Sequence, residues 1–342
     1  MRTIEWKEGT LFTIDQTLLP DQEVWIKMKN CREVAEAIKE MKVRGAPLIG
    51  VTAAYGLALT AYHSRAKNIE DLMREIEHSA QLLRKTRPTA VNLFWAIDRI
   101  LKKARETKGD VNLLKNVIIE EAKRIADEDV MVNRRIGEHG SKLISDGDTI
   151  LTHCNAGKLA TVDYGTALAV IRVAWEEGKK IKVIAGETRP KLQGARLTTY
   201  ELMRDGIPVT LITDNMVGYL MYKGLIDKVI VGADRIVRDA VINKIGTYTI
   251  AVLAQEHNVP FYVAAPLSTF DLRASAKDVV IEERNPEEVT QIKSIRIAPP
   301  DVSVLNPAFD ITPLKYVDAI ICEKGVLSRE DVEKLAEKEE AN

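Results

Sequence analysis

The pattern of apolar residues changes after residue 148, and this change constrains the fold more than any other feature. Short apolar runs then alternate with segments of helical periodicity. The runs cover residues 149–152, 181–185, 209–213, 228–232 and 261–265. The helical segments cover residues 165–178, 199–206, 216–224 and 246–258. Such alternation predicts right-handed βαβ units and a parallel sheet, and fully apolar runs indicate strands buried on both faces.

The first part of the chain has a different pattern. Residues 1–30 alternate apolar and polar residues between turn signals, which predicts short antiparallel strands. Apolar residues then recur at helical spacing up to about residue 125. We therefore predict an α/β protein with two domains. Residues 1–144 would form a mostly helical domain with a short β segment, and residues 145–342 a Rossmann-like parallel-sheet domain.

Composition narrows the class of protein. A length of 342 residues suits two domains, and a net charge of −1 from mixed charges argues against a nucleic-acid binder. The three cysteines are odd in number and widely spaced, which fits neither a disulfide framework nor a zinc site and suits a reducing cytoplasm. The first residues lack the apolar core of a signal peptide, and no apolar stretch is long enough to span a membrane.

A polar loop, residues 186–198, follows the apolar run 181–185. It contains two arginines, Gln193, two glycines and two hydroxyl groups. Ligands of open α/β sheets bind at the carboxyl ends of the strands. The loop is therefore suited to hold a polyol phosphate, although a solvated crossover loop would have a similar composition.

Two reactive side chains follow other predicted strands. Cys154 comes just after the run 149–152, where a following helix N-terminus can lower a thiol pKa, but a lone cysteine is more often a buried small apolar residue. Asp234 comes just after the run 228–232 and could act as a general acid, or form a salt bridge or a helix cap. Asp214 and Asn215 are expected to cap the helix near Met216, with Asp214 a lesser site candidate.

Cationic side chains stand beside three predicted helix starts. Asn243 and Lys244 precede a helix near residue 247, where lysine and backbone N–H groups can meet a phosphate. Arg44 precedes Gly45, Ala46 and a proline at a helix start, and Arg87 stands in the same arrangement. Lys244 could equally be an ordinary surface lysine. Each arginine motif alone is a weak signal, but the two together suggest a phosphate held between the domains. The histidines lack metal-ligand spacing, and no nucleotide-binding glycine motif is present, so we expect no cofactor.

Together these motifs resemble the family of 5-methylthioribose-1-phosphate isomerases of methionine salvage. The resemblance spans nearly the whole chain and includes residues 44–47, 87–93, 152–157, 186–190, 193–194, 196–197, 232–235, 243–244 and 306–310. The superfamily also contains ribose-1,5-bisphosphate isomerase and regulatory subunits of translation initiation factor 2B. The resemblance implies a homodimeric aldose–ketose isomerase of a sugar phosphate, with Cys154 and Asp234 catalytic. It implies substrate binding by Arg44, Gly45, Ala46, Arg87, Gln193, Asn243 and Lys244.

The implied chemistry is consistent with these residue types. The anomeric oxygen of the substrate is phosphorylated, so the ring must open by breaking the bond to the ring oxygen. Asp234 would protonate that oxygen, and Cys154 would stabilise the electron-poor carbon or transfer a proton. Hydride transfer and proton transfer through an enediol-like state both remain open. A regulatory subunit that binds sugar phosphates or nucleotides without turnover is one alternative, and it would need neither residue. The other is ribose-1,5-bisphosphate isomerase, which needs a cationic contact for the second phosphate.

Overall fold

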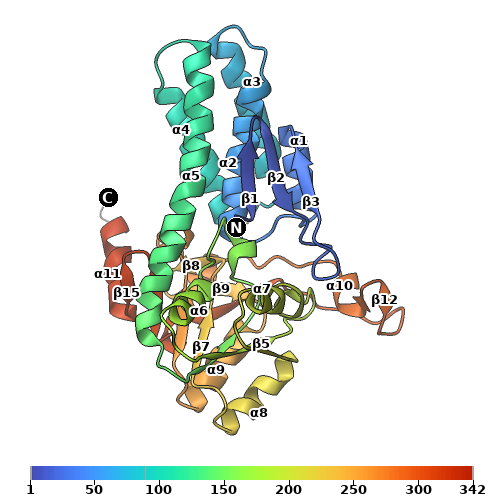
Figure 1. Cartoon of the computed structure of the whole chain (residues 1–342), viewed down its shortest axis with the longest axis vertical. Coiled ribbons are helices and arrows are strands. Elements are labelled where there is room, and N and C mark those ends of the chain that lie inside the picture. Colours follow the sequence, from blue (N-terminus) through green and yellow to red (C-terminus); the bar gives the residue numbers. More distant parts are fainter. Residues whose placement is uncertain (1, 89, 341–342) are drawn as a thin grey trace. The chain divides into compact units, whose positions relative to one another are not determined.

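A computed structural model describes residues 2–88 and 90–340 (Figure 1). The chain forms two compact units. The first comprises Met1–Arg134 and Gly157–Gly165, and the second comprises Arg135–Ala156 and Thr166–Asn342. The return of residues 157–165 to the first unit was not anticipated from the sequence. None of the helices in the described residues is long and apolar enough to cross a membrane.

The first unit combines a small sheet with a helix bundle, as the sequence predicts. Its antiparallel strands are β1 (Ile4–Lys7), β2 (Thr10–Ile14) and β3 (Trp25–Met28). Its helices are α1 (Cys31–Lys39), α2 (Ala46–His63), α3 (Ile69–Arg84), α4 (Val91–Glu106) and the first part of α5 (Val111–Gly140).

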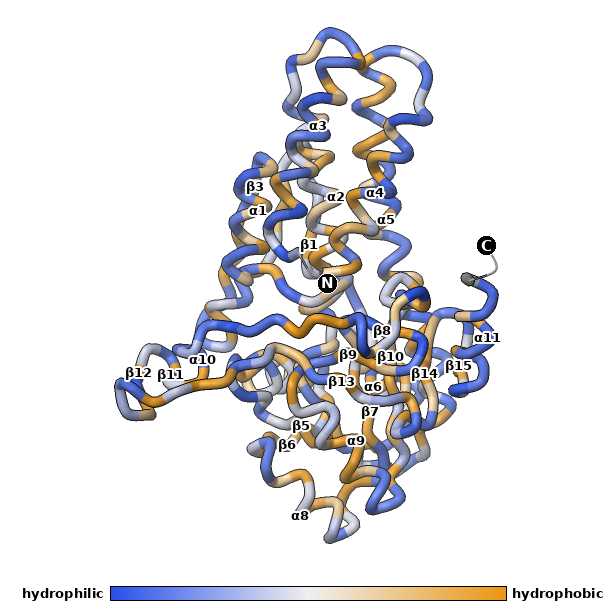
Figure 2. Tube along the Cα trace, turned by 180° about the vertical axis from the view of Figure 1, so that it is seen from behind, coloured by the Kyte–Doolittle hydropathy of each residue, from blue (hydrophilic) through white to orange (hydrophobic). Residues whose placement is uncertain are grey.

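Side-chain caps and hydrophobic patterning explain these helices. Asn30 and Asn68 cap α1 and α3 by accepting hydrogen bonds from the N–H groups of Glu33 and Asp71 at 3.0 and 2.8 Å. Most of α2 is buried because it is apolar on every side, whereas α3 and α4 bury one face. Hydrophobic segments accordingly line the interior of the bundle in Figure 2.

The second unit is built on a seven-stranded sheet in the order β15-β14-β10-β7-β4-β5-β6. The strands are β4 (Thr149–Thr152), β5 (Lys182–Gly186), β6 (Val209–Ile212), β7 (Lys228–Val231), β10 (Phe261–Ala264), β14 (Ala319–Cys322) and β15 (Gly325–Leu327). The described pairs are parallel except β14 with β15. The helices of this unit include α6 (Ala167–Glu176), α7 (Thr199–Arg204), α8 (Val217–Tyr222), α9 (Thr247–Glu256) and α11 (Arg329–Glu340).

The order of the parallel strands creates a topological switch point. The chain runs outward from β4 through β5 to β6, then returns to place β7 on the other side of β4. This is the arrangement of doubly wound folds, whose ligands bind beyond the carboxyl ends of the strands at the switch point. The predicted α/β class with a Rossmann-like parallel sheet is confirmed.

Smaller sheets extend the second unit and were not foreseen from the sequence. Strands β8 (Arg235–Val237), β9 (Ala240–Lys244) and β13 (Phe309–Pro313) form an antiparallel sheet in the order β13-β9-β8. A short excursion holds α10 (Glu287–Thr290), β11 (Gln291–Ile292) and β12 (Ile295–Arg296). The sheet matters for the site because it supports the segment that contains Asn243 and Lys244.

Candidate active site

Cys154 and Asp234 follow the two strands that meet at the switch point. Cys154 lies two residues beyond β4, and Asp234 lies between β7 and β8. Gly232 brings the two segments together, because a Cβ added there would be 2.7 Å from the Cβ of Ala156. The main chain of Asp234 is fixed by an N–H bond to the carbonyl of Ile242 at 3.0 Å. Both residues are partly exposed to solvent.

The main chain of Cys154 has an uncommon conformation. Its φ is +63°, in the left-handed region that residues with a Cβ seldom adopt. The N–H of Cys154 donates to Oγ1 of Thr188 at 2.8 Å, and its carbonyl accepts from Oγ1 of Thr198 at 2.6 Å. The Cys154 thiol is in no disulfide and is half-buried, whereas Cys31 and Cys322 are buried.

The loop after β5 packs tightly over the end of that strand. Gly194 opens a π-helical turn, η3 (Gly194–Thr198), and a Cβ on this glycine would lie 1.8 Å from the carbonyl oxygen of Gly186. Gln193 is buried just before the turn, and its Oε1 has no hydrogen-bond partner among the described residues. A buried amide oxygen of this kind can accept a hydrogen bond from a sugar hydroxyl. Arg189 bonds the carbonyl of Val289 at 2.7 Å, so its guanidinium braces the loop.

Asp214 does not cap the helix near Met216, contrary to our expectation. Its carboxylate accepts the N–H groups of Thr188 and Arg189 at 2.8 and 2.7 Å, so it stabilises the loop after β5 instead. Asn215 accepts from Oγ1 of Thr213 at 2.5 Å, and neither η4 (Asp214–Met216) nor α8 has a side-chain cap. The expectation failed because local sequence does not reveal a carboxylate's partners in another loop.

His153 is buried and lies near Asp214. Its Nε2 lies 2.9 Å from the carbonyl oxygen of Ile245, so this nitrogen carries the hydrogen and donates. Nδ1 lies 3.8 Å from Oδ1 of Asp214. Burial lowers the pKa of His153, and the nearby Asp214 carboxylate opposes this shift. The side chain of His153 thus fastens β4 to the start of α9.

Asn243 and Lys244 end β9 and are both buried. Asn243 donates to Oγ1 of Thr247 at 3.0 Å, and Lys244 donates to the carbonyl of Ala308 at 2.6 Å. The Lys244 ammonium also lies 4.7 Å from the centre of the Phe309 ring. This places a buried positive charge beside the N-terminus of α9, a combination that favours an anion.

Asp310 occupies the N-terminus of α9. Its Oδ2 accepts the N–H groups of Gly246 and Tyr248 at 2.7 and 3.1 Å. Burial raises the pKa of this carboxyl to about 6, although the backbone hydrogen bonds and Lys244 act in the opposite direction. Its Oδ1 is buried without a hydrogen-bond partner among the described residues.

The other sequence-predicted binding residues belong to the first unit. Arg44 precedes α2, and Gly45 is the N-cap with a φ of +93°. A Cβ on Gly45 would lie 2.5 Å from Cα of Ala160, so the returning segment packs against this helix start. Ala46 is the first residue of α2, and Arg87 precedes α4. Thr89, part of the predicted Arg87 motif, lies outside the described residues.

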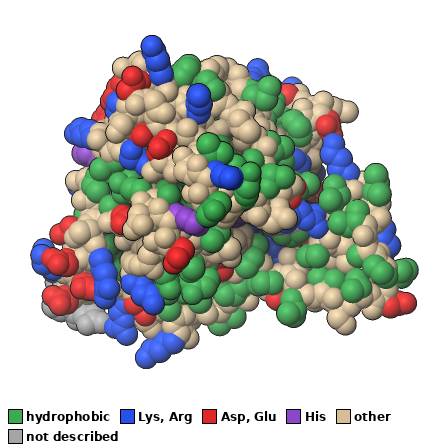
Figure 3. Space-filling view, turned by 90° about the horizontal axis from the view of Figure 1, so that it is seen from below, with side chains coloured by type: hydrophobic (Ala, Val, Ile, Leu, Met, Phe, Trp, Pro, Cys, Tyr) green, Lys and Arg blue, Asp and Glu red, His purple; other side chains and the backbone are tan. Residues whose placement is uncertain are grey.

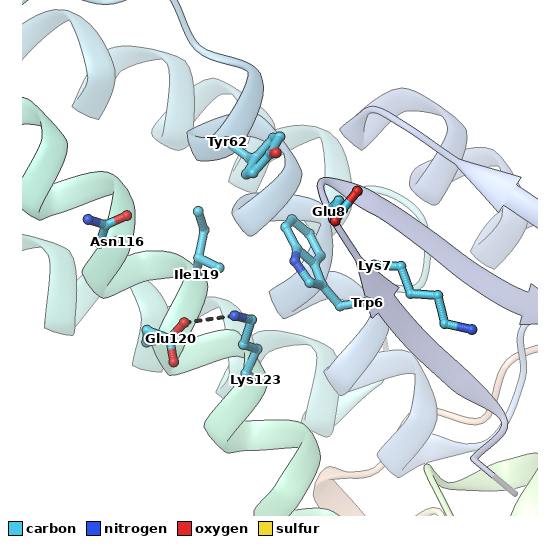
Figure 4. Close-up of a pocket in the computed structure, with 8 residues that line it drawn as sticks. All are labelled: Trp6, Lys7, Glu8, Tyr62, Asn116, Ile119, Glu120 and Lys123. Atoms are coloured by element: carbon cyan, nitrogen blue, oxygen red, sulfur yellow. Dashed lines mark hydrogen bonds and ion pairs between the residues drawn. The ribbon is translucent and has the colours of Figure 1, made fainter.

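A hollow of about 810 Å³ lies in the first unit, and its lining includes none of the residues predicted for the site. Its lining comes from β1, the following turn, α2 and α5, as Figure 4 shows. The residues are Trp6, Lys7, Glu8, Tyr62, Asn116, Ile119, Glu120 and Lys123. Within residues 2–88 and 90–340, no three His, Cys, Asp or Glu side chains come together as a metal site.

Sequence reasoning missed the residues that support Cys154. Thr188 and Thr198 were noted only as hydroxyls of the polar loop, and Asp310 only as part of a motif. A signal was present for the threonines, since both fall within the loop that follows β5. Their partners are the main-chain atoms of another segment, and these cannot be identified from composition.

Several known proteins are similar to this chain in architecture and in sequence. The chain matches the initiation factor 2 subunit family over residues 42–329. It is 55% identical to the methylthioribose-1-phosphate isomerase of Acetivibrio thermocellus over 330 residues, which cover 96% of each chain. The crystal structure of 5-methylthioribose 1-phosphate isomerase from Pyrococcus horikoshii OT3 has 49% identity and a TM-score of 0.93, covering 100% of this chain and 96% of that one.

A further crystal structure is described as translation initiation factor eIF-2B, subunit delta, from A. fulgidus. It has 54% identity and a TM-score of 0.89, covering 98% of this chain and 99% of that one. The chain belongs to the initiation factor 2 subunit family. Within that family it groups with the methylthioribose-1-phosphate isomerases, and the resemblance inferred from the sequence is confirmed.

Proposed function

We propose that this protein converts 5-methylthioribose 1-phosphate into 5-methylthioribulose 1-phosphate in methionine salvage. The observation that carries the proposal is the location of Cys154 and Asp234 beyond the adjacent strands β4 and β7. Relatives above 50% identity over almost the whole chain bear the name of this isomerase, which supports the choice of substrate. The widely spaced cysteines support a cytoplasmic enzyme.

Asp234 acts as the general acid in this proposal. It gives its proton to the ring oxygen while the bond from that oxygen to the anomeric carbon breaks. The anomeric carbon, which keeps its phosphate, becomes electron-poor. Cys154 stabilises this carbon or transfers a proton, and a hydrogen moves from the neighbouring carbon as hydride or through an enediol-like state. Loss of the neighbouring hydroxyl proton completes the ketone and can restore the carboxylic acid of Asp234.

The substrate-binding residues are Arg44, Gly45, Ala46, Arg87, Gln193, Asn243 and Lys244. Arginine guanidinium groups beside helix starts suit a phosphate dianion, and so does the buried Lys244 ammonium. The buried Oε1 of Gln193 suits a sugar hydroxyl. A site of this composition needs no cofactor.

We also propose a homodimer. The edge strand β6 exposes Leu211, and the α8 region exposes Met216, Tyr219 and Tyr222. Figure 3 shows hydrophobic side chains gathered on the face seen from below. Exposed apolar patches beside an open sheet edge are typical of association surfaces. A monomer mass by light scattering at micromolar protein would refute the dimer.

A regulatory subunit that binds sugar phosphates without turnover is the second candidate. It is favoured by one observation, the description of a structure 54% identical to this chain as a subunit of initiation factor eIF-2B. Such a subunit has no use for an acid and a thiol at the switch point. Turnover therefore separates the two candidates.

The test compares kcat/KM for 5-methylthioribose 1-phosphate, its 5-deoxy analogue and ribose 1,5-bisphosphate. An apolar cup for the methylthio group favours the first compound by roughly 1–3 kcal/mol and penalises an unpaired second phosphate strongly. We expect the deoxy compound to react more slowly and the bisphosphate to be a poor substrate. A preference for the bisphosphate would identify the related isomerase, and turnover of none would favour the regulatory subunit.

A further inference from the structure

The unusual main-chain conformation of Cys154 requires support from its surroundings. A φ of +63° at a residue with a Cβ is costly and persists only where neighbouring groups fix it. The direction of a side chain is set first by the main chain that bears it. The groups that hold the Cys154 main chain therefore also determine where the thiol points.

Two buried hydroxyl groups supply this support. Oγ1 of Thr188 accepts the N–H of Cys154 at 2.8 Å, and Oγ1 of Thr198 donates to its carbonyl at 2.6 Å. Both threonines are fully buried and come from the crossover between β5 and α7. Cys154 is thus held on both main-chain polar groups by a segment distant in sequence.

Each threonine is itself held in place. Thr188 has a φ of +64°, and its N–H donates to Oδ1 of Asp214 at 2.8 Å. On the other side, Oγ1 of Thr198 lies 3.2 Å from Nδ2 of Asn155, which also donates to Glu201 at 3.0 Å.

The contacts from Thr198 continue through Asn155 and Glu201 to a buried ion pair. Glu201 accepts from Arg172 at 2.7 Å, and Arg172 also donates to Asp205 at 2.7 Å. Glu201 and Arg172 are buried, and a buried polar network with its groups paired is rigid. Thr198 is therefore anchored to the body of the second unit rather than to a mobile loop.

We propose that Thr188 and Thr198 are positioning residues that fix the main chain of Cys154 and aim its thiol. They act through Cys154 and do not themselves take part in the chemistry. The proposal for turnover rests on the function proposed above, whereas the effect on the thiol does not.

The test compares three variants in the turn that contains Thr198. Thr198→Val removes the bond to the Cys154 carbonyl, and Thr198→Ser keeps the hydroxyl. Thr199→Val is the matched control, because Oγ1 of Thr199 bonds the carbonyl of Ala195 at 2.5 Å in the same turn. Thermal unfolding is measured for each, and Thr198→Ala takes the place of the valine variant if that variant does not fold.

Two readouts separate positioning from a general structural role. We expect Thr198→Val to lower kcat by about 10–100-fold with KM nearly unchanged, because small misplacements of a reacting group have effects of this size. The second readout is the rate at which iodoacetamide alkylates Cys154, followed by peptide mass spectrometry at alkaline pH, where the thiol is ionised. This rate should rise severalfold in Thr198→Val, since the freed segment exposes the thiol. Thr198→Ser and Thr199→Val should have kcat values and alkylation rates close to those of the unmodified protein.

The outcomes are distinct. An unchanged alkylation rate in folded Thr198→Val, or an equal loss of kcat in Thr199→Val, overturns the positioning role. A faster alkylation with unchanged kcat supports the positioning of Cys154 and contradicts its proposed part in catalysis. Faster alkylation in a protein that turns over none of the sugar phosphates supports the positioning and overturns the proposed function.

Discussion

Gly232 lies so close to Ala156 that a Cβ added to the glycine would be 2.7 Å from the Cβ of Ala156. Real Cβ atoms do not approach this closely, so any larger residue must push the two segments apart. These segments lead to Asp234 and away from Cys154. A larger residue at position 232 should therefore displace the segments that bear the two proposed catalytic groups.

Gly232→Ala should lower both activity and stability. Overpacking a tight contact costs about 1–3 kcal/mol, and a displaced acid should reduce kcat by about tenfold or more. Thermal unfolding and steady-state kinetics measure the two effects. The control is Gly218→Ala in α8, where the nearest atoms would be 3.6 Å away and helix propensity favours alanine by up to about 1 kcal/mol. Equal behaviour of the two variants would contradict the prediction.

Cys154→Ser and Asp234→Asn should each abolish most turnover and leave the fold intact. Loss of one proton-transfer group typically costs about 10²–10⁴-fold, and we expect the loss in kcat with little change in KM. Cys31→Ser is the control, because Cys31 is buried in the first unit and burial raises its pKa to about 11. Rates near those of the unmodified protein in either site variant would remove that residue from the mechanism.

Arg44→Ala and Arg87→Ala should weaken substrate binding rather than the chemical step. A charge-assisted hydrogen bond to phosphate contributes roughly 1.5–3 kcal/mol, which should appear as a higher KM and weaker inhibition by inorganic phosphate. The exposed Arg65 offers a control in the same unit, and Arg65→Ala should change neither quantity. The proposed phosphate binding by Arg44 and Arg87 is wrong if both variants keep the KM and the phosphate inhibition of the unmodified protein.

Asp310 should make stability depend on pH. Its pKa in the folded protein is about 6, above the ordinary value of 3.8, so the folded state binds the extra proton between these values. The protonated carboxyl therefore adds to the free energy of unfolding, by at most about 3 kcal/mol. This stabilisation is complete below about pH 4 and is lost as the pH rises through about 6. Asp310→Asn, which cannot ionise, should gain stability relative to the unmodified protein over this range. Urea unfolding at pH 4.5 and 7 measures the difference, and parallel changes in the two proteins would contradict the prediction.

Much of the fold was predictable from local sequence. The apolar runs at residues 149–152 and 228–232 became β4 and β7, because a strand buried on both faces leaves an uninterrupted apolar run. Helices α1, α3 and α4 followed their 3.6-residue periodicity, whereas α2 is apolar on every side and carries no such signal. The positions of Cys154 and Asp234 beyond strand ends followed from the same patterns.

The sequence by itself determined which segments are strands and helices and which reactive residues follow them. Only the tertiary structure decided that β4 and β7 are neighbours, because the order of strands in a sheet depends on packing between segments far apart in the chain. For the same reason it alone revealed the pairing of β9 with β13 and the hydrogen bonds from Thr188 and Thr198 to Cys154. Local patterns encode burial and backbone preference, whereas the partners of a polar group are fixed only when distant segments meet.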